Sequence, residues 1–265
     1  MSVRHGLVPN LIDSCNHPRF NARDATWYFL RCVVEYCKQA PNGYSILSAP
    51  VWRLFPADGG EPRESTLVET MQEILEAHAN GISFREWNAG PKIDSKMRDE
   101  GFNIEISRNS ETGFLHGGNR FNCGTWMDLM GHSEKYGNKG IPSTPRDGAP
   151  VEIVGAQMRV LTDLAEFYKK GLYPYDAAGG LKFEKWARQI RENFHRCFFV
   201  PEDESKDGMF VIDRKYVNKR GIYKDTFGAT QPWEDYQLRP NFFFAMAYVN
   251  IMHLYCDFHL FFEFL

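Results

Sequence analysis

The sequence lacks the short motifs that mark several common kinds of catalytic site. It has no G-x-x-x-x-G-K-[ST] phosphate loop, no G-x-S-x-G nucleophile turn, and no H-E-x-x-H or C-x2-C metal-ligand spacing. Its eight histidines are dispersed along the chain. Nucleotide hydrolysis, serine-esterase chemistry and metal catalysis therefore have no motif to support them.

A strong charge of one sign and closely spaced cysteines are also missing. The formal net charge of −3 gives no broad basic field, which argues against a nucleic-acid partner. The six scattered cysteines are Cys15, Cys32, Cys37, Cys123, Cys197 and Cys256. This scatter indicates buried, reduced thiols in a cytosolic protein. The N-terminus shows no apolar stretch with a cleavage site, so secretion is not indicated.

Long uncharged hydrophobic runs are absent as well. The most apolar segment, residues 242–265, contains Asn250, Asp257 and Glu263. A membrane-spanning helix needs about 20 largely uncharged residues. We therefore expect no membrane partner, and we predict that this segment is a buried helix that starts at Pro240.

Apolar residues that do recur regularly have helical spacing. The segments with this spacing are residues 24–39, 66–81, 150–170 and 181–198. Thr66 and Glu69 have the spacing of a capping box, and Gly81 suits the end of the same helix. No convincing pair of alternating strands is visible, and residues 82–149 show no clear period. The sequence therefore predicts an all-α fold with long loops.

One stretch, residues 113–148 (here called the long loop), is rich in glycine yet too apolar for a disordered tail. It presents a carboxylate, an indole, amides and guanidinium groups. This combination suits a sugar, because an aromatic face covers the ring while amides and guanidinium groups bind hydroxyls. The candidate site residues of this loop are Asn119, Arg120, Asn122, Trp126, Asp128, Arg146 and Asp147.

Asp128 is the first choice for a catalytic acid. Such an acid protonates the leaving oxygen of a glycosidic bond, and the apolar neighbours Trp126 and Met127 would raise its pKa. The alternative is that Asp128 caps a short helix, which is a common use of a loop aspartate.

Two Arg-Asp pairs are equally open to two interpretations. Arg23 and Asp24 stand at a predicted helix start. In the first interpretation, Asp24 caps the helix and Arg23 pairs with a surface acid. In the second, the two side chains form a fork that holds two sugar hydroxyls, with Trp27 behind it. Asp147 suits the cap of the following helix. In the functional interpretation, Arg146 lines the sugar-binding cleft.

Several long stretches resemble one family. They are RHGLVPNL (4–11), NARDATWYFLRC (21–32), GISFREWNAGPKID (81–94), DEGFNI (99–104), GGNRFNCGTWMDLMG (117–131), GIPSTPRDGAPVEIVG (140–155), KRGIYKD (219–225) and PWEDYQLRPNF (232–242). In order and in content they resemble the C-terminal half of eukaryotic glycogen debranching enzymes. The resemblance covers nearly all of residues 4–245.

The resemblance implies an amylo-α-1,6-glucosidase domain with the fold of a partial (α/α)6 toroid with long functional loops. It implies inverting hydrolysis of the α-1,6-linked glucose at a branch of glycogen limit dextrin, with Asp128 as the general acid. Arg23 and Asp24 correspond to the pair that binds the terminal glucose. The family is cytosolic, binds glycogen and needs no metal or organic cofactor. In its full-length members a separate domain, absent here, has 4-α-glucanotransferase activity.

The resemblance is expected to end near residue 246. Residues 1–246 then form the front portion of the glucosidase domain, and residues 247–265 form a divergent apolar tail. The general-base glutamate of the family lies beyond this point, and no family match supports Glu152 or Asp225 as a substitute. We therefore expect a truncated form with little activity. The alternatives are a non-catalytic oligosaccharide-binding fragment and an aggregation-prone product.

Overall fold

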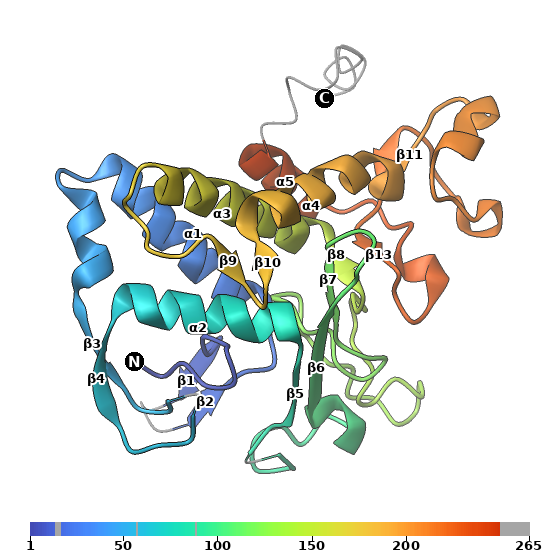
Figure 1. Ribbon diagram of the computed structural model, residues 1–265. Coiled ribbons are helices and arrows are strands. Elements are labelled where there is room, and N and C mark those ends of the chain that lie inside the picture. The colour runs from blue at the N-terminus through green and yellow to red at the C-terminus, as the bar shows by residue number, and fades with distance from the viewer. Residues whose placement is uncertain (14–16, 57, 88, 250–265) are drawn as a thin grey trace.

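The computed structural model describes residues 1–13, 17–56, 58–87 and 89–249 (Figure 1). The helices of this part are α1 (Asp24–Gln39), α2 (Leu67–Asn80), α3 (Val151–Lys169), α4 (Phe183–Phe198) and α5 (Asn241–Val249), with short 3-10 helices η1 (Gly43–Ser48), η2 (Asp99–Phe102), η3 (Glu204–Met209), η4 (Arg214–Tyr216) and η5 (Pro232–Glu234). The first four α-helices confirm the helices predicted from apolar spacing. The continuation predicted beyond Val249, and with it the tail, lies outside the described residues.

The capping box predicted for α2 is present. The Glu69 amide donates to the Thr66 hydroxyl at 3.3 Å, and the Thr66 amide donates to the Glu69 carboxylate at 2.8 Å. These two bonds satisfy donors that a helix start otherwise leaves without an intrahelical partner. Gly81, with a φ of 95°, then ends the helix.

The all-α prediction is wrong, and with it the assignment to an all-helical toroid. Short strands lie between the helices: β1 (Leu11–Asp13), β2 (His17–Arg19), β3 (Pro50–Arg53), β4 (Arg63–Thr66), β5 (Ile82–Arg85), β6 (Asn103–Arg108), β7 (Leu115–Gly117), β8 (Ala149–Pro150), β9 (Ala177–Ala178), β10 (Leu181–Lys182), β11 (Phe199–Val200), β12 (Ile222–Tyr223) and β13 (Thr226–Phe227). They pair in small antiparallel sheets, and the largest of these within the described residues has the order β5-β6-β7.

Most of these strands are too short to produce a visible period of two. Strand β6 is the exception, because Ile104 and Ile106 are buried while Asn103 and Glu105 point outward. That alternation is present in the sequence NIEISR and was the signal that could have revealed the sheet.

The helices form the core of the molecule. Helix α3 packs against α1, α4 and α5, and its first half is buried all round (Figure 1). Gly155 of α3 makes the contact with α5 possible, because a Cβ atom at this position would lie 2.7 Å from the Ala245 Cα atom.

Strands β1 to β6 lie on the side of α2 away from α3, whereas β9 and β10 lie between α2 and α4 (Figure 1). Strand β7 leads into the long loop and β8 follows it. The backbones of Gly117 and Gly148 exchange two hydrogen bonds of 2.9 and 3.0 Å, which bring the two ends of the loop together. Within the described residues, no helix is long and apolar enough to cross a membrane.

Candidate active site

Arg23 binds two separate parts of the long loop, residues 123–124 and residues 146–148. Its guanidinium group donates to four backbone carbonyls, those of Cys123 at 3.3 Å, Gly124 at 3.2 Å, Arg146 at 3.1 Å and Gly148 at 2.6 Å. Burial lowers the pKa of Arg23 to about 10, so the group still carries its charge at neutral pH. The side chain thus holds loop backbone in this structure, and direct binding of glucose by Arg23 stays a prediction.

Asp24 fixes the centre of the same loop. Its carboxylate accepts hydrogen bonds from the backbone amides of Trp126 at 2.6 Å and Ala25 at 2.8 Å. Burial raises the pKa of this carboxyl, and the two amide bonds oppose the rise. The indole of Trp126 remains 53% exposed, so Asp24 places an accessible aromatic face beside the loop.

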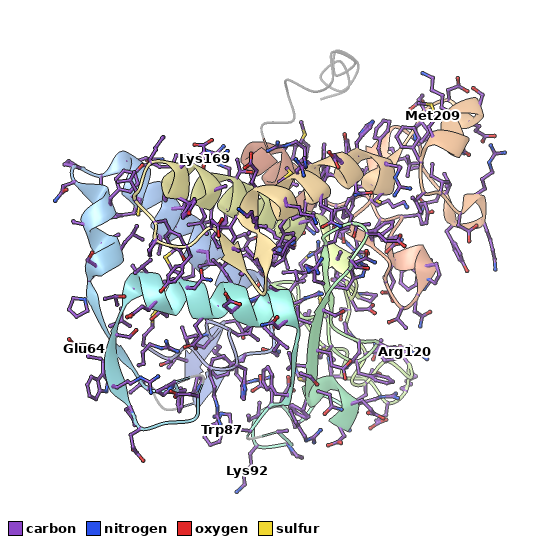
Figure 2. The ribbon with its side chains drawn as sticks, in the orientation of Figure 1. Glu64, Trp87, Lys92, Arg120, Lys169 and Met209 are labelled. Atoms are coloured by element: carbon purple, nitrogen blue, oxygen red, sulfur yellow. The ribbon has the colours of Figure 1, made fainter. Side chains whose placement is uncertain are left out.

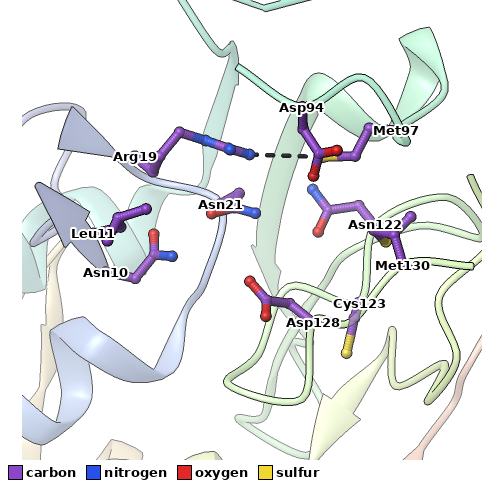
Figure 3. A pocket seen from close by; sticks show the side chains of 10 residues that line it. All are labelled: Asn10, Leu11, Arg19, Asn21, Asp94, Met97, Asn122, Cys123, Asp128 and Met130. Carbon is purple, nitrogen blue, oxygen red and sulfur yellow. Dashed lines mark hydrogen bonds between the residues drawn. The ribbon is translucent and has the colours of Figure 1, made fainter. Parts of the chain in front are cut away.

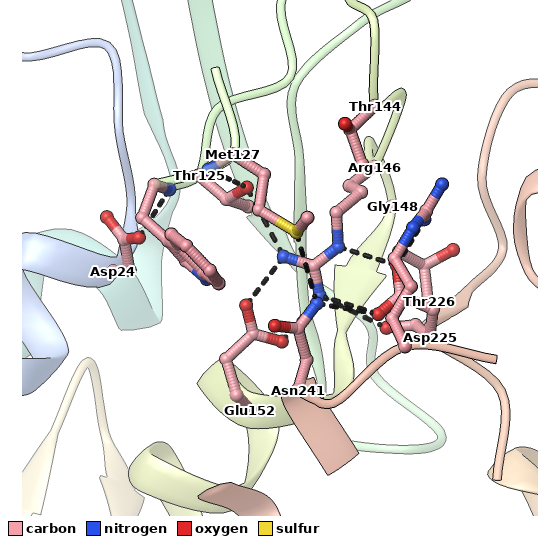
Figure 4. A network of polar contacts seen from close by, with 12 residues as sticks. Asp24, Thr125, Met127, Thr144, Arg146, Gly148, Glu152, Asp225, Thr226 and Asn241 are labelled. Atoms are coloured by element: carbon pink, nitrogen blue, oxygen red, sulfur yellow. Dashed lines mark hydrogen bonds and ion pairs between the residues drawn. The ribbon is translucent and has the colours of Figure 1, made fainter. Parts of the chain in front are cut away.

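Arg146 lies at the centre of a fully buried ion network (Figure 4). Its guanidinium group pairs with both oxygens of Glu152, each at 2.6 Å, and with both oxygens of Asp225 at 2.7 and 3.1 Å. It also donates to the Thr125 hydroxyl at 3.3 Å. These carboxylates raise the pKa of Arg146 beyond its usual range despite its burial.

The network is balanced in charge and joins distant segments. Asp225 also accepts from Arg239 at 2.5 Å and from the Asn241 amide at 2.8 Å. Two guanidinium groups therefore face two carboxylates. Because the network connects the long loop, the start of α3, residue 225 and the start of α5, it fixes the loop to the helical core.

Asp147 does not cap α3, because the residue at the helix N-cap is Pro150, which has no side-chain cap. Its carboxylate instead accepts bonds from the backbone amide and the hydroxyl of Thr230. It also binds the carboxyl of Glu234, and burial together with this contact raises the pKa of Glu234 to about 8. Glu234 thus holds its proton more readily than an ordinary glutamate does.

Asp128 lines a small pocket of about 60 Å³ at the edge of the long loop (Figure 3). The other walls come from the N-terminal segment, from the loop before β6 and from the long loop itself, and the lining residues are Asn10, Leu11, Arg19, Asn21, Asp94, Met97, Asn122, Cys123 and Met130. No other described residue donates a hydrogen bond to the Asp128 carboxylate. The carboxyl is therefore available to a ligand.

The surroundings of Asp128 favour its protonated form. The carboxyl is open to solvent on one side, yet desolvation by the surrounding protein raises its pKa above the usual aspartate value. The negative charge of Asp94 acts in the same direction, and the positive charge of Arg19 opposes it. A carboxyl that keeps its proton more readily is suited to donate it.

The other predicted residues take different places. Asn122 is buried in the pocket wall, where its amide donates to the Gly101 carbonyl at 2.7 Å. Asn119 donates to the Glu100 carbonyl at 3.0 Å and so ties the loop to η2. Arg120 lies on the outer surface of the loop (Figure 2). Trp27 is fully buried in the core against His78, so its contact with a sugar stays a prediction.

Sequence reasoning missed the opposite wall of the pocket, formed by Asn10, Arg19, Asn21 and Asp94. These residues are more than 30 positions away from Asp128 in the chain, and no spacing rule connects them. Only the long stretches 4–11, 21–32 and 81–94 pointed to the segments that contain Asn10, Asn21 and Asp94, and these side chains carried no separate signal.

Glu152 and Asp225, considered as substitute bases, are both bound to Arg146 and have no exposed side-chain surface. Among the described residues, no group of three or more histidine, cysteine or acidic side chains is arranged to hold a metal ion.

The fold and this pocket can now be compared with known proteins. A profile of the amylo-alpha-1,6-glucosidase family matches residues 1–254, and the chain therefore belongs to that family of glycoside hydrolases. The glycogen debranching enzyme of Saccharomyces cerevisiae is 47% identical over 261 residues, which cover 93% of this chain and 17% of the yeast protein. These matches confirm the resemblance carried by residues 4–245. The chain spans only this small share of its relative.

Proposed function

We propose that the pocket hydrolyses the α-1,6-linked glucose at branches of glycogen limit dextrin, with Asp128 as the general acid. The observation that supports this most is the raised pKa of a carboxyl that accepts no hydrogen bond from another described residue, in a pocket lined by amides. The matching family and the yeast relative support the choice of bond and of polymer. The proposal covers the glucosidase step only.

The chemistry assigned to Asp128 is the transfer of its proton to the glycosidic oxygen as the bond to the glucose carbon breaks. Inverting hydrolysis also needs a second carboxylate, about 6.5–9.5 Å away, to activate water. Glu152 and Asp225 are unsuited to that role because Arg146 binds both of them in the interior. The proton donor is therefore the part of the reaction that we assign to the described residues.

The remaining predicted residues support this site in two ways. Trp126 offers an exposed ring face for a pyranose, and Asn122 lines the pocket beside Asp128. Arg23, Asp24, Arg146 and Asp147 hold the loop that presents these groups. We propose that they act on glucose binding through the position of the loop.

The test is glucose release from limit dextrin by the 265-residue chain and by its Asp128→Asn variant. We expect the variant to lose about 10²–10⁴-fold in rate, the usual contribution of a general acid. NMR of fresh product should show the β-anomer if the reaction inverts. Equal rates for the two proteins would contradict the assignment of Asp128.

A second candidate function is oligosaccharide binding without hydrolysis, which the exposed indole of Trp126 favours. In that case Trp126→Ala abolishes binding of maltooligosaccharides, Asp128→Asn leaves it unchanged, and neither protein releases glucose. Hydrolysis by the unmodified chain would exclude this alternative.

We also propose a cytoplasmic location, because glycogen is the substrate proposed here. The cysteines of the described residues, Cys32, Cys37, Cys123 and Cys197, are free thiols, and such thiols suit a reducing compartment.

A further inference from the structure

Three polar atoms in the Asp128 pocket have no partner within hydrogen-bond distance among the described residues. They are the amide oxygens of Asn10 and Asn21 and the Nε atom of Arg19, and all three are buried. Their residues line the same pocket as Asp128 (Figure 3). Buried polar atoms are nearly always paired, and an exception calls for an explanation, such as a bound water or ligand.

The local structure holds these three side chains together on one wall. The backbone amide of Asn10 donates to the Arg19 carbonyl at 2.9 Å, which places the two residues side by side where β1 pairs with β2. Asn21 follows two positions later. Figure 3 shows Arg19 reaching across the pocket toward Met97 and Asp94, with Asp128 on another side.

A buried carboxylate orients the arginine of this wall. The Glu86 carboxylate lies 3.6 Å from the Arg19 Nε atom and also accepts the Phe20 amide at 2.9 Å. The far end of the guanidinium group contacts the Met97 sulfur at 3.6 Å. Arg19 is therefore held in place before any ligand arrives, with its Nε–H facing Glu86 at a distance longer than a normal hydrogen bond.

The chemistry of the wall suits adjacent hydroxyl groups. A hydroxyl can donate to an amide oxygen and accept from a guanidinium N–H, and it also binds an amide in either flipped orientation. A volume of about 60 Å³ holds a few water molecules but not a whole pyranose ring. A pyranose ring would therefore enter by one hydroxyl-bearing edge, with the rest of the ring across the mouth.

We infer that Asn10, Arg19 and Asn21 bind the hydroxyl groups of the glucose unit whose glycosidic oxygen faces Asp128, and so determine which sugar the site accepts. This inference rests on the proposed function, since it takes an α-glucoside as the ligand. It makes the N-terminal segment a specificity element of the site.

The experiment measures binding of methyl α-glucoside and of its four mono-deoxy analogues (2-, 3-, 4- and 6-deoxy) to the 265-residue chain. The variants are Asn10→Ala, Asn21→Ala and Arg19→Met, with the exposed Asn218→Ala as the matched control. Each pocket variant should bind the glucoside about tenfold more weakly, the effect of one lost hydrogen bond. The control should bind it unchanged.

The deoxy analogues separate recognition from a structural effect. If Asn21 binds one particular hydroxyl, the unmodified chain discriminates against the analogue that lacks it, and Asn21→Ala does not. Three outcomes would each overturn the inference. The variants could lose affinity by the same factor for all analogues, all variants could keep their affinity, or the unmodified chain could fail to bind the glucoside.

Failure of this inference can be told apart from failure of the proposed function. If the three pocket variants release glucose from limit dextrin with an unchanged KM, the proposed hydrolysis stands and the role of the wall in binding glucose is refuted. Selective binding through the wall without any glucose release would do the reverse.

Discussion

At the scale of single residues, Arg146 concentrates the buried charge of the site. Its two carboxylate partners, Glu152 and Asp225, have no exposed surface. Such a network is costly to form but far more costly to leave half complete, because a remaining charge has no water to solvate it. Its value here is geometric, since it fixes the end of the long loop to α3, residue 225 and α5.

The first prediction concerns this arginine. Arg146→Met should lower the free energy of unfolding by about 3–5 kcal/mol, because Glu152 loses its ion partner in the interior and Asp225 keeps only Arg239. Arg146→Lys should recover only part of the loss, since an ammonium group cannot pair with two carboxylates in the same forked geometry. Urea unfolding at neutral pH measures both.

The control for that measurement is Arg63→Met, which removes an exposed ion pair with Asp58. Exposed pairs contribute about 0–1 kcal/mol. A loss for Arg146→Met as small as the loss for Arg63→Met would refute the account of the network.

The second prediction concerns the carboxyl pair of Glu234 and Asp147. The folded chain holds the Glu234 proton up to a pKa of about 8, whereas the unfolded chain releases it near the ordinary value of 4.5. The folded state therefore binds more protons between these values, and this contribution to stability is lost as the pH rises through 8. Glu234→Gln keeps a donor to Asp147 and cannot ionise.

The variant should consequently unfold at a higher urea concentration than the unmodified chain at pH 9 and at a similar concentration at pH 4. The exposed Glu61→Gln serves as the matched control and should change neither value. Identical pH profiles for Glu234→Gln and the unmodified chain would show that the fold does not raise the pKa of Glu234.

The sequence identified some of these residues and could not identify others. Asp128 was predicted because a carboxylate between Trp126 and a glycine-rich flank is a local pattern. Asn10 and Asn21 were not predicted. They are distinguished by amide oxygens without a hydrogen-bond partner in the pocket, and this property arises only when distant segments of the chain meet. The network role of Arg146 likewise depends on residue 225, which only the fold brings close.

At the scale of elements, helices and strands differed in how well the sequence predicted them. Helices α1 and α2 span several turns, so apolar spacing and the Thr66–Glu69 capping box were sufficient. Strands such as β8 and β12 have two residues each and are defined by their partners alone. Tertiary pairing, rather than local preference, creates them.

The third prediction tests the contact between helices α3 and α5. Alanine normally stabilises a helix interior by about 1 kcal/mol relative to glycine. At Gly155 the added methyl group would lie 2.7 Å from the Ala245 Cα atom and 3.0 Å from its Cβ atom, so α5 must shift. Gly155→Ala should therefore destabilise the chain by about 1–3 kcal/mol, as overpacking usually does.

Urea unfolding of Gly155→Ala, Ala245→Gly and the double variant provides the check. The double variant should be more stable than the sum of the two single effects, because Ala245→Gly removes one of the two clashing atoms. A more stable Gly155→Ala protein would mean that α5 does not pack on α3 in this way.

At the scale of the whole molecule, the chain carries several histidines that the fold keeps neutral. Burial lowers the pKa of His78, His116 and His195 from 6.5 to about 4. Between these values the unfolded chain binds more protons than the folded chain. The histidines therefore leave stability intact above pH 6.5 and reduce it as the pH falls toward 4.

The fourth prediction isolates His78, which is fully buried against Trp27. The unmodified chain should lose more free energy of unfolding between pH 6.5 and pH 4 than His78→Leu does, by up to about 3 kcal/mol. The comparison uses the change with pH within each protein, so any direct effect of the substitution on packing cancels. Parallel pH profiles would contradict it.

Arg23 has a consequence for how this site can change. Its four bonds to the carbonyls of Cys123, Gly124, Arg146 and Gly148 close the long loop into a ring. The segment between residues 129 and 143 hangs from that ring, and extending such a segment adds little closure entropy. New sequences of different length can therefore be inserted in this segment to change the surface beside Asp128, while residues 123–124 and 146–148 keep their place.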